Sequence, residues 1–376
     1  MDQQLLNKIE LELKKSVPAR ATAAWVKKYF SNTGPVDLTA FDKALLAPMR
    51  ELLSRGGKRW RPYLLVLCAR VSSIGRGRAG TDLAQNAISH EAMALRLSPA
   101  PELLHNATLI VDDFEDRSPE RRGGPAIHRV YGEDMAINAA NFFYFYPILY
   151  AKQKVGSDLA GAATDMIIQE MTNVHLGQTM DIYWHNNPDH PVTEVMYFEM
   201  CRLKTGTMAR LAARLGVLAG AAGSACPVAK VYGDLAKSRA RSVPAQQLAG
   251  PAKLGKFAET LGVAFQIRDD LENISPQGRL GKTFGDDITE GKRSLLVIRA
   301  LTRLKPAAAA ELKQILNSHT PDRGQINCAI ELINSTDAFE YARQTVLNCK
   351  QKALKILADT GLKDIAQLED LVNQIA

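Results

Sequence analysis

Carboxylate side chains cluster at the end of an apolar segment near residue 112. The run Thr108–Val111 leads directly into Asp112, Asp113, Glu115 and Asp116. In a helix over residues 101–116, Asp112 and Asp116 would share one face, about 6 Å apart along the axis. Such carboxylates repel each other unless a cation lies between them, and they suit Mg²⁺ shared with substrate phosphates. The alternative is an acidic helix end exposed to solvent.

A second acidic cluster follows about 150 residues later in the chain. Asp269 and Asp270 end an apolar helix expected over residues 253–273, and Asn273 stands four positions after Asp269. Ligand-type residues thus recur with the spacing of the first cluster. An amide oxygen at Asn273 can still bind a cation or orient a water molecule. The repetition favours a metal site over two unrelated helix ends.

The basic residues stand in short groups beside glycine and do not form one long tract. The 376-residue chain carries a formal net charge of +7. The groups are Arg55–Arg61, Arg121–Gly124 and Gly281–Lys282. A positive balance favours anionic partners, and groups of this kind indicate discrete phosphate sites. No nucleic-acid-binding module is visible, so nucleic acid is not an expected partner.

Cysteine usage and the N-terminal residues predict a cytoplasmic protein. The five cysteines are odd in number and far apart, without a CxxC pair, which is typical of reduced thiols. Residues 1–20 lack the apolar core of a signal peptide. No run of eighteen apolar residues is present, so no transmembrane segment is expected.

Helical spacing of apolar residues recurs along the whole chain, whereas strand-like alternation is nearly absent. We therefore predict an all-α fold and a single domain over residues 1–376. Residues 1–50 form N-terminal helices, and residues 224–252 form a basic, linker-like insertion. Helices are predicted at 2–15, 38–53, 61–73, 83–97, 101–116, 134–153, 156–184, 193–221, 253–273, 292–303, 307–317 and 337–359.

Eight ordered motifs resemble those of the trans-isoprenyl diphosphate synthases, the head-to-tail prenyltransferases, over about residues 50–300. They are Gly56–Pro62, His105, Asp112–Asp116, the pair Arg121 and Arg122, Gln178 with Asp181, Lys204–Gly206, Phe265–Asp270, and the segment Gly281–Lys292. Any one of these motifs is weak by itself. The order of all eight is specific to this family.

The resemblance implies a large helical bundle around a central cavity, the isoprenoid synthase fold, in a homodimer. It implies that isopentenyl diphosphate elongates an allylic diphosphate, either dimethylallyl, geranyl or farnesyl diphosphate. Mg²⁺ is the implied cofactor, with three ions. Contact with a membrane is expected only as peripheral contact during product release.

The resemblance also assigns roles to individual residues. The implied metal ligands are Asp112, Asp116 and Asp269, while Asp113 and Asp270 orient ligands or bound water. The diphosphate that ionises is held by Arg121, Lys204, Lys282 and Lys292. The second diphosphate is held by Lys58, Arg61, His105 and Arg122. Thr205 and Gln266 are further substrate-binding candidates. The alternative for Thr205 is a backbone cap, and the alternative for Gln266, as for Gln178 and Asp181, is a buried hydrogen-bonding role.

Small residues before the first aspartate predict a product longer than fifteen carbons. Farnesyl-making relatives have a bulky aromatic residue four or five positions before this aspartate, where the chain has Thr108 and Ala107. The aromatic run 142–146 is expected to line the far end of the cavity. We predict a twenty-carbon product, geranylgeranyl diphosphate, and expect Ala107→Phe to shorten it to fifteen carbons.

Two other functions fit parts of the pattern. A class I terpene cyclase also ionises a diphosphate with bound metal, but its second motif, (N/D)DxxSxxxE, is not found. A non-catalytic subunit of a heteromeric synthase usually lacks one aspartate motif, whereas this chain keeps both. One assay with isopentenyl and allylic diphosphates separates the three functions. A synthase elongates the chain, a cyclase releases a hydrocarbon, and a non-catalytic subunit makes no product.

Overall fold

The computed structural model describes residues 1–30, 34–73, 83–187, 189–221, 245–275 and 285–376. The described residues are almost entirely helical. Their strands, β1 (Glu120–Arg121) and β2 (Gly124–Pro125), form one short antiparallel hairpin in which Arg121 faces Gly124. The predicted all-α fold is confirmed.

The first half of the chain supplies the following helices: α1 (Gln3–Ser16), α2 (Ala23–Tyr29), α3 (Leu38–Phe41), the π-helical turn η1 (Asp42–Leu46), α4 (Ala47–Ser54), α5 (Trp60–Ser73), α6 (Leu83–Leu97), α7 (Pro99–Glu115), α8 (Ile127–Tyr131), α9 (Glu133–Lys154) and α10 (Ser157–Asn186). The second half supplies these: α11 (Glu194–Cys201), the π-helical turn η3 (Arg202–Gly206), α12 (Thr207–Gly220), α14 (Ala245–Asn273), α15 (Asp286–Thr289), α16 (Leu295–Arg303), α17 (Pro306–Asn317), α18 (Arg323–Asn334), α19 (Ala338–Ala358) and α20 (Ala366–Ile375).

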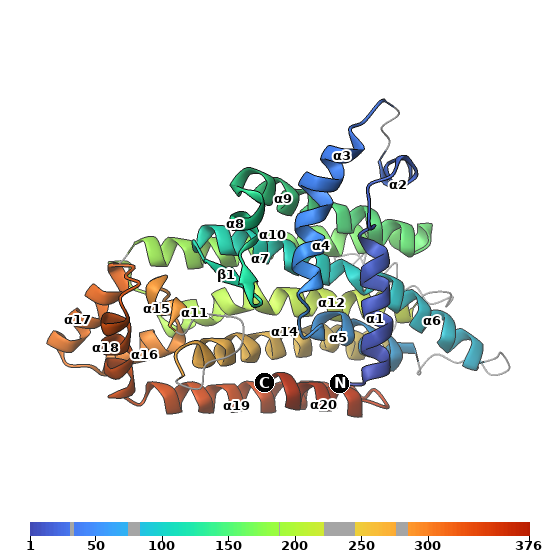
Figure 1. The fold of residues 1–376 in the computed structure, drawn as a ribbon. Coiled ribbons are helices and arrows are strands. Elements are labelled where there is room, and N and C mark those ends of the chain that lie inside the picture. Colours follow the sequence, from blue (N-terminus) through green and yellow to red (C-terminus); the bar gives the residue numbers. More distant parts are fainter. Residues whose placement is uncertain (31–33, 74–82, 188, 222–244, 276–284) are drawn as a thin grey trace.

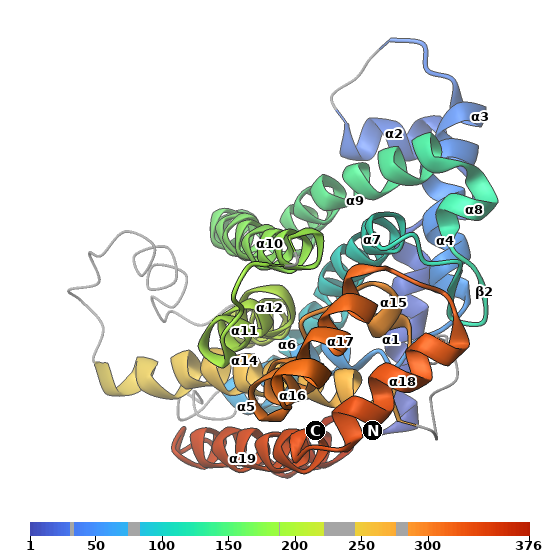
Figure 2. The ribbon, with the colours of Figure 1, turned by 90° about the vertical axis from the view of Figure 1, so that its left-hand side faces the viewer.

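The longest helices lie side by side, so that α10, α12, α14 and α19 follow one another in a stack (Figures 1 and 2). Helix α7 packs against α9, which in turn packs against α10. The two ends of the chain meet beside this stack, where the Met1 amino group donates a hydrogen bond to Gln374 at 2.6 Å. The stack and α7 together surround the space described below.

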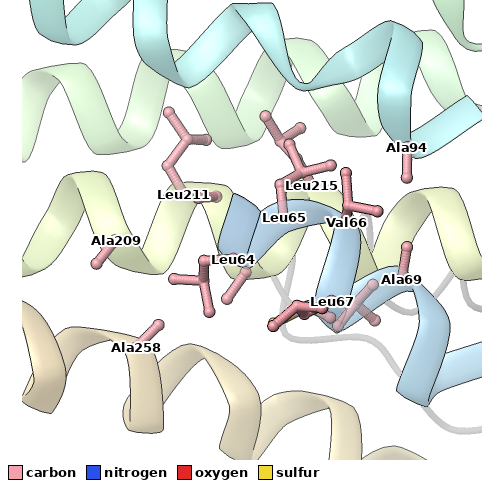
Figure 3. Packing of buried hydrophobic residues seen from close by; sticks show 14 of the residues in the cluster. Leu64, Leu65, Val66, Leu67, Ala69, Ala94, Ala209, Leu211, Leu215 and Ala258 are labelled. Atoms are coloured by element: carbon pink, nitrogen blue, oxygen red, sulfur yellow. The ribbon is translucent and has the colours of Figure 1, made fainter. Parts of the chain in front are cut away.

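Helix α5 lies inside the bundle and is buried on nearly all its faces, which explains why it is apolar all round. Leu64 and Leu65 of α5 pack with Leu211 and Leu215 of α12 (Figure 3). Burying each such leucine contributes about 2 kcal/mol. A Cβ atom at Gly216 of α12 would lie 2.2 Å from the Leu65 carbonyl oxygen, so glycine allows the two helices to approach this closely.

Most predicted helices are confirmed, with three corrections. Two predicted helices are interrupted by a π-helical turn, and a third begins earlier than predicted. The predicted helix 38–53 is divided into α3, η1 and α4. The predicted helix 193–221 contains the π-helical turn η3. Residues 245–252, predicted as part of the basic insertion, are the first turns of α14. The rest of that predicted insertion, up to residue 244, lies outside the described residues.

Among the described residues, the prediction missed five helices. They are α2, α8, α15, α18 and α20. Helix α18 buries Ile326, Ala329, Ile330 and Ile333 at helical spacing, and Asp322 caps it by accepting from the Gln325 amide. Helix α20 repeats the pattern with Leu368, Leu371, Val372 and Ile375. The spacing was present in both, but each helix spans about three turns or fewer, which weakens a periodic signal.

Among the described helices, none combines the length and the apolar character that crossing a lipid bilayer requires. The assignment of the chain to one domain stays a prediction.

Candidate active site

A cavity of about 380 Å³ opens between α7, α10, η3 and α14. The loop before α5 and the segment around residues 287–294 complete its wall. The predicted site residues that line it are Lys58, Arg61, His105, Thr108, Asp112, Arg121, Arg122, Gln178, Asp181, Lys204, Thr205, Gln266, Asp269, Asp270 and Lys292. Three predicted residues, Ala107, Asp113 and Asp116, are not among the lining residues. Lys282 lies outside the described residues.

The first aspartate cluster is held by two lysines from other parts of the chain. Lys204 of η3 donates to Asp112 at 3.2 Å and to Asp181 at 2.7 Å. Lys292 donates to Asp116 at 2.8 Å. Burial alone would lower the pKa of Lys204, but the carboxylates of Asp112 and Asp181 outweigh it and raise that pKa. Positive charge therefore lies where the repulsion between these carboxylates requires it.

The second aspartate cluster is fixed by hydrogen bonds around Asp270. Tyr197 of α11 donates to one carboxylate oxygen at 2.6 Å, and Gln266 donates to the other at 2.9 Å. Thr205 in turn donates to the Gln266 side chain at 2.5 Å. Burial raises the pKa of Asp270 to about 6, although both donors act in the opposite direction. These contacts orient Asp270 and support its neighbour Asp269, which lines the cavity.

Glycines allow η3 to bring Lys204 and Thr205 up to the cavity. A Cβ atom at Gly177 of α10 would lie 2.5 Å from the Lys204 amide nitrogen. One at Gly262 of α14 would lie 2.7 Å from the Gly206 Cα atom. Both glycines thus let α10 and α14 close on the π-helical turn, a feature often found at functional sites.

The guanidinium group of Arg61 is buried in the wall of the cavity, and its burial is electrostatically costly. Its side chain lies 4.7 Å from the Trp60 ring and 5.9 Å from the Phe265 ring, and its buried Nε atom donates no hydrogen bond. Burial lowers the pKa of Arg61 to about 10, with Glu102 acting in the opposite direction. Burying a charged group without hydrogen-bond partners is costly. An anion in the cavity would remove that cost.

The β-hairpin turns two further arginines toward the same cavity. Arg121 donates through Nε to Asp113 at 2.7 Å, so the fully buried Asp113 supports Arg121 from behind. Arg122 has a left-handed backbone, with φ of 53°, and donates to Asn106 at 2.9 Å. His105 lies near these arginines. Burial, as the larger cause, and the positive charge of the arginines lower the pKa of His105 well below its usual value. A neutral imidazole therefore faces the cavity.

The donor atoms available fit Mg²⁺. They are carboxylate oxygens from two facing helices, the ligands that Mg²⁺ uses when it shares its coordination sphere with substrate phosphates. Lysine ammonium groups lie against Asp112 and Asp116, so both positions already accommodate a cation. Over the described ranges, no three acidic, histidine or cysteine side chains converge closely enough to hold a metal by themselves.

The residues proposed to set product length divide between two environments. Thr108 lines the cavity, whereas Ala107 is fully buried in the hydrophobic cluster beneath α9. Of the predicted aromatic run, Tyr144 alone lines the cavity, where its ring meets that of His175 at 5.3 Å. Phe145 points away and is 67% exposed.

Sequence reasoning missed two side chains that this geometry brings into the site. Tyr197 is buried in a hydrophobic cluster, and it precedes Lys204 by seven residues, which is two helical turns on one face. Glu102 lines the cavity and precedes His105 by three residues on the same helix. The spacing is a signal in both cases, but only the folded chain shows what each side chain contacts.

Two curated relatives match most of the chain. A geranylgeranyl pyrophosphate synthase of Penicillium canescens is 32% identical over 321 residues, which cover 85% of this chain and 81% of that protein. A geranylgeranyl pyrophosphate synthase of Dictyostelium discoideum is 34% identical over 259 residues, which cover 69% and 74%, respectively.

Solved structures share the fold. A geranylgeranyl pyrophosphate synthase of Corynebacterium glutamicum, complexed with isoprenyl diphosphate and magnesium, has a TM-score of 0.77 at 22% identity, covering 99% of this chain and 98% of that one. A decaprenyl diphosphate synthase of Rhodobacter capsulatus has a TM-score of 0.73 at 21% identity, covering 99% and 98%. Since synthases named for different products share this fold, the fold by itself does not set product length.

The family model described as polyprenyl synthetase matches residues 42–333. This range contains both aspartate clusters, both lysines that hold the first cluster, and the arginines of the opposite wall. The range, the curated relatives and the geometry agree, and we conclude that this chain belongs to the polyprenyl synthetase family.

Proposed function

We propose that the protein condenses isopentenyl diphosphate with an allylic diphosphate and releases geranylgeranyl diphosphate. One observation carries the proposal: a buried guanidinium without a hydrogen bond at Nε, that of Arg61, faces the same cavity as Asp112 and Asp269. One wall thus offers carboxylates for a metal-bound diphosphate, and another wall offers positive charge for a second one. The names of the curated relatives agree with this reaction.

The allylic diphosphate lies against the aspartate clusters in this proposal. Three Mg²⁺ ions held by Asp112, Asp116 and Asp269 would act as Lewis acids on its oxygens. Lys204, Lys292 and Arg121 donate hydrogen bonds to the same diphosphate and stabilise the negative charge that develops on it. Lys282 is proposed for the same role from the resemblance alone. Asp113 and Asp270 hold Arg121 and the second cluster in position.

The isopentenyl diphosphate lies against the basic wall. Lys58, Arg61 and Arg122 bind its phosphates, and arginine can do so with two parallel hydrogen bonds. The neutral imidazole of His105 donates one more. This diphosphate must not leave, so the wall supplies positive charge, and the Glu102 carboxylate on this wall is bound by Arg59.

The bonding changes follow from this placement. The C1–O bond of the allylic substrate breaks, the alkene of isopentenyl diphosphate attacks C1, and a new carbon–carbon bond forms. A proton then leaves the carbon next to the resulting cation. The departing diphosphate accepts that proton, so no side chain is required as the base.

The test is an incubation of purified protein with isopentenyl diphosphate, each allylic diphosphate in turn, and Mg²⁺, followed by sizing of the products. We expect chain elongation that ends at twenty carbons. A hydrocarbon product would identify a cyclase. No product from any primer would indicate a non-catalytic subunit.

Tyr144 is proposed to end chain growth, because it is the residue of the run 142–146 that lines the cavity. Tyr144→Ala is expected to shift the main product beyond twenty carbons, as removal of the ring extends the space available. The products are sized by chromatography after dephosphorylation. Leu347→Ala, at an exposed position of α19 that does not line the cavity, is the control, and equal product lengths in both variants would contradict the role of Tyr144.

The homodimer is proposed to form through α9 and α10. Phe145 of α9 and three residues of α10, Ile168, Leu176 and Tyr183, expose 51–67% of their surface. The α10 residues are spaced at eight and seven positions and lie on one helical stripe. A second copy of the chain would bury these apolar groups.

We expect Leu176→Glu to convert the dimer to a monomer, because a carboxylate would be buried without a partner at the interface. Light scattering coupled to size-exclusion chromatography measures the mass. Leu347→Glu, at a similarly exposed leucine of α19, is the control and is expected to leave the mass unchanged. A dimeric Leu176→Glu variant would place the interface elsewhere. The cytoplasmic location and the peripheral membrane contact stay predictions.

A further inference from the structure

A buried polar network lies at the basic wall of the cavity and contacts arginines from two separate loops. Glu102 of α7 is 2% exposed and accepts a hydrogen bond from Arg59 at 2.8 Å. Asn106, one turn later on α7, donates to the Glu102 carboxylate at 3.1 Å and accepts from Arg122 at 2.9 Å. Glu102 and Asn106 thus connect the loop before α5 with the β-hairpin.

Both arginines need external support, because both have strained backbones. Arg59 has φ of 50° and Arg122 has φ of 53°, a left-handed region that costs non-glycine residues energy. A Cβ atom at Gly57 would lie 3.2 Å from the Arg122 guanidinium, so the two loops are in close contact. Such conformations persist only where surrounding contacts hold them. The contacts of Glu102 and Asn106 are of this kind.

The N-terminal helix adds a second carboxylate to the network. Glu10 of α1 accepts from Arg59 Nε at 2.6 Å, while Arg59 Nη2 donates to the Leu53 carbonyl at 2.7 Å. Helix α1 lies before residue 42, where the match to the family model begins. Arg59 lines the cavity beside Lys58 and Arg61, but it donates hydrogen bonds to Glu10, Glu102 and the Leu53 carbonyl.

The charges in the network support the same interpretation. Burial would raise the pKa of Glu102, but Arg59, Arg122 and Arg61 together lower it. Glu102 is therefore ionised among three guanidinium groups. Its charge reduces their mutual repulsion, and its carboxylate accepts hydrogen bonds from Arg59 and Asn106.

Resting on the function proposed above, we propose that Glu102 and Asn106 are positioning residues for the isopentenyl diphosphate site. They act through Arg59 and Arg122, and they leave the allylic site to the aspartates and lysines. Loss of either should therefore weaken binding of one substrate only. The KM for isopentenyl diphosphate should therefore change while the KM for the allylic diphosphate does not. General destabilisation of the fold would not produce this difference.

The decisive variant is Asn106→Leu, because it removes the connection to Arg122 without changing any charge. We expect the KM for isopentenyl diphosphate to rise about tenfold, the factor that corresponds to about 1.4 kcal/mol. The KM for the allylic diphosphate and kcat should stay within about twofold of the original values. Steady-state kinetics with each substrate varied in turn measures all three quantities.

Glu102→Gln is the second variant, and it tests whether loss of the carboxylate charge raises or lowers the KM for isopentenyl diphosphate. If the carboxylate acted only by repelling the substrate, its neutralisation would lower the KM for isopentenyl diphosphate. Positioning predicts that this KM rises, because Arg59 and Arg122 lose their ionic partner. This variant keeps nearly the same volume, so it also provides the test if Asn106→Leu fails to fold.

Glu170→Gln is the matched control. Glu170 of α10 is likewise fully buried and is bound by Arg210 and Arg214, but it does not line the cavity. We expect a lower melting temperature and no selective change in KM. If Asn106→Leu and Glu102→Gln leave the KM for isopentenyl diphosphate unchanged, or raise both KM values equally, the positioning role is wrong. If the unmodified protein elongates no substrate, the proposed function fails instead.

Discussion

Asp112→Asn is expected to reduce the kcat of chain elongation on the order of 10³-fold, which corresponds to about 4 kcal/mol of transition-state stabilisation. Asp112 lies where α7, α10 and η3 meet, and it accepts hydrogen bonds from Gln178 at 3.0 Å and from Lys204 at 3.2 Å. An amide at this position keeps the shape of the side chain but loses the charge that binds a divalent cation. The diphosphate would then leave without its main source of charge neutralisation.

The measurement is product formation against Mg²⁺ concentration, together with calorimetric titration of Mg²⁺ in the presence of inorganic pyrophosphate. We expect weaker Mg²⁺ binding and an unchanged KM for isopentenyl diphosphate, because the basic wall is separate from Asp112. Asp165→Asn, at an exposed position of α10, should change neither quantity. Full turnover with normal Mg²⁺ dependence in Asp112→Asn would remove this aspartate from the metal site.

Thr108→Phe is expected to shift the product almost completely from twenty to fifteen carbons. Thr108 lies one turn before Asp112 on α7 and lines the cavity, so a phenyl ring there occupies the space of the growing chain. The sequence by itself places this test at Ala107. The structure places Ala107 in the cluster with Leu103 and Phe143, away from the cavity.

Ala107→Phe therefore becomes the control for Thr108→Phe. A large side chain in a packed cluster costs about 1–3 kcal/mol, so this variant should melt at a lower temperature with its product length unchanged. Products are sized by chromatography after dephosphorylation. A shift to fifteen carbons in Ala107→Phe, with no shift in Thr108→Phe, would reverse the assignment of the two faces of α7.

The sequence was sufficient to predict the helical fold and the family. Helical spacing is a local property, and it identified α1, α5, α7, α9 and α10 with ends close to those observed. Motif order was equally informative, because residue types such as paired carboxylates and glycine-flanked arginines have few other uses in this arrangement. Short helices such as α18 were missed because few turns give a weak periodic signal.

Local spacing did not predict which side chains would meet. It placed Thr108 and Ala107 near the same site, but only the packing of α7 against α9 separated them. It did not place Tyr197 in the site, whereas the approach of α11 to α14 joins its hydroxyl group to Asp270. The pairing of Lys204 with Asp112 spans 92 positions in the chain and depends on the π-helical turn η3.

The sequence by itself determined the chemistry of this protein, because the residue types decide which side chains can carry a charge and which can bind a metal ion. The tertiary structure decided which of them share a cavity, which are buried as supports, and which wall each one lines. The physical reason is distance: charge and hydrogen bonding act over a few ångströms, and folding alone brings residues from α1, α7, α10 and α14 within that range.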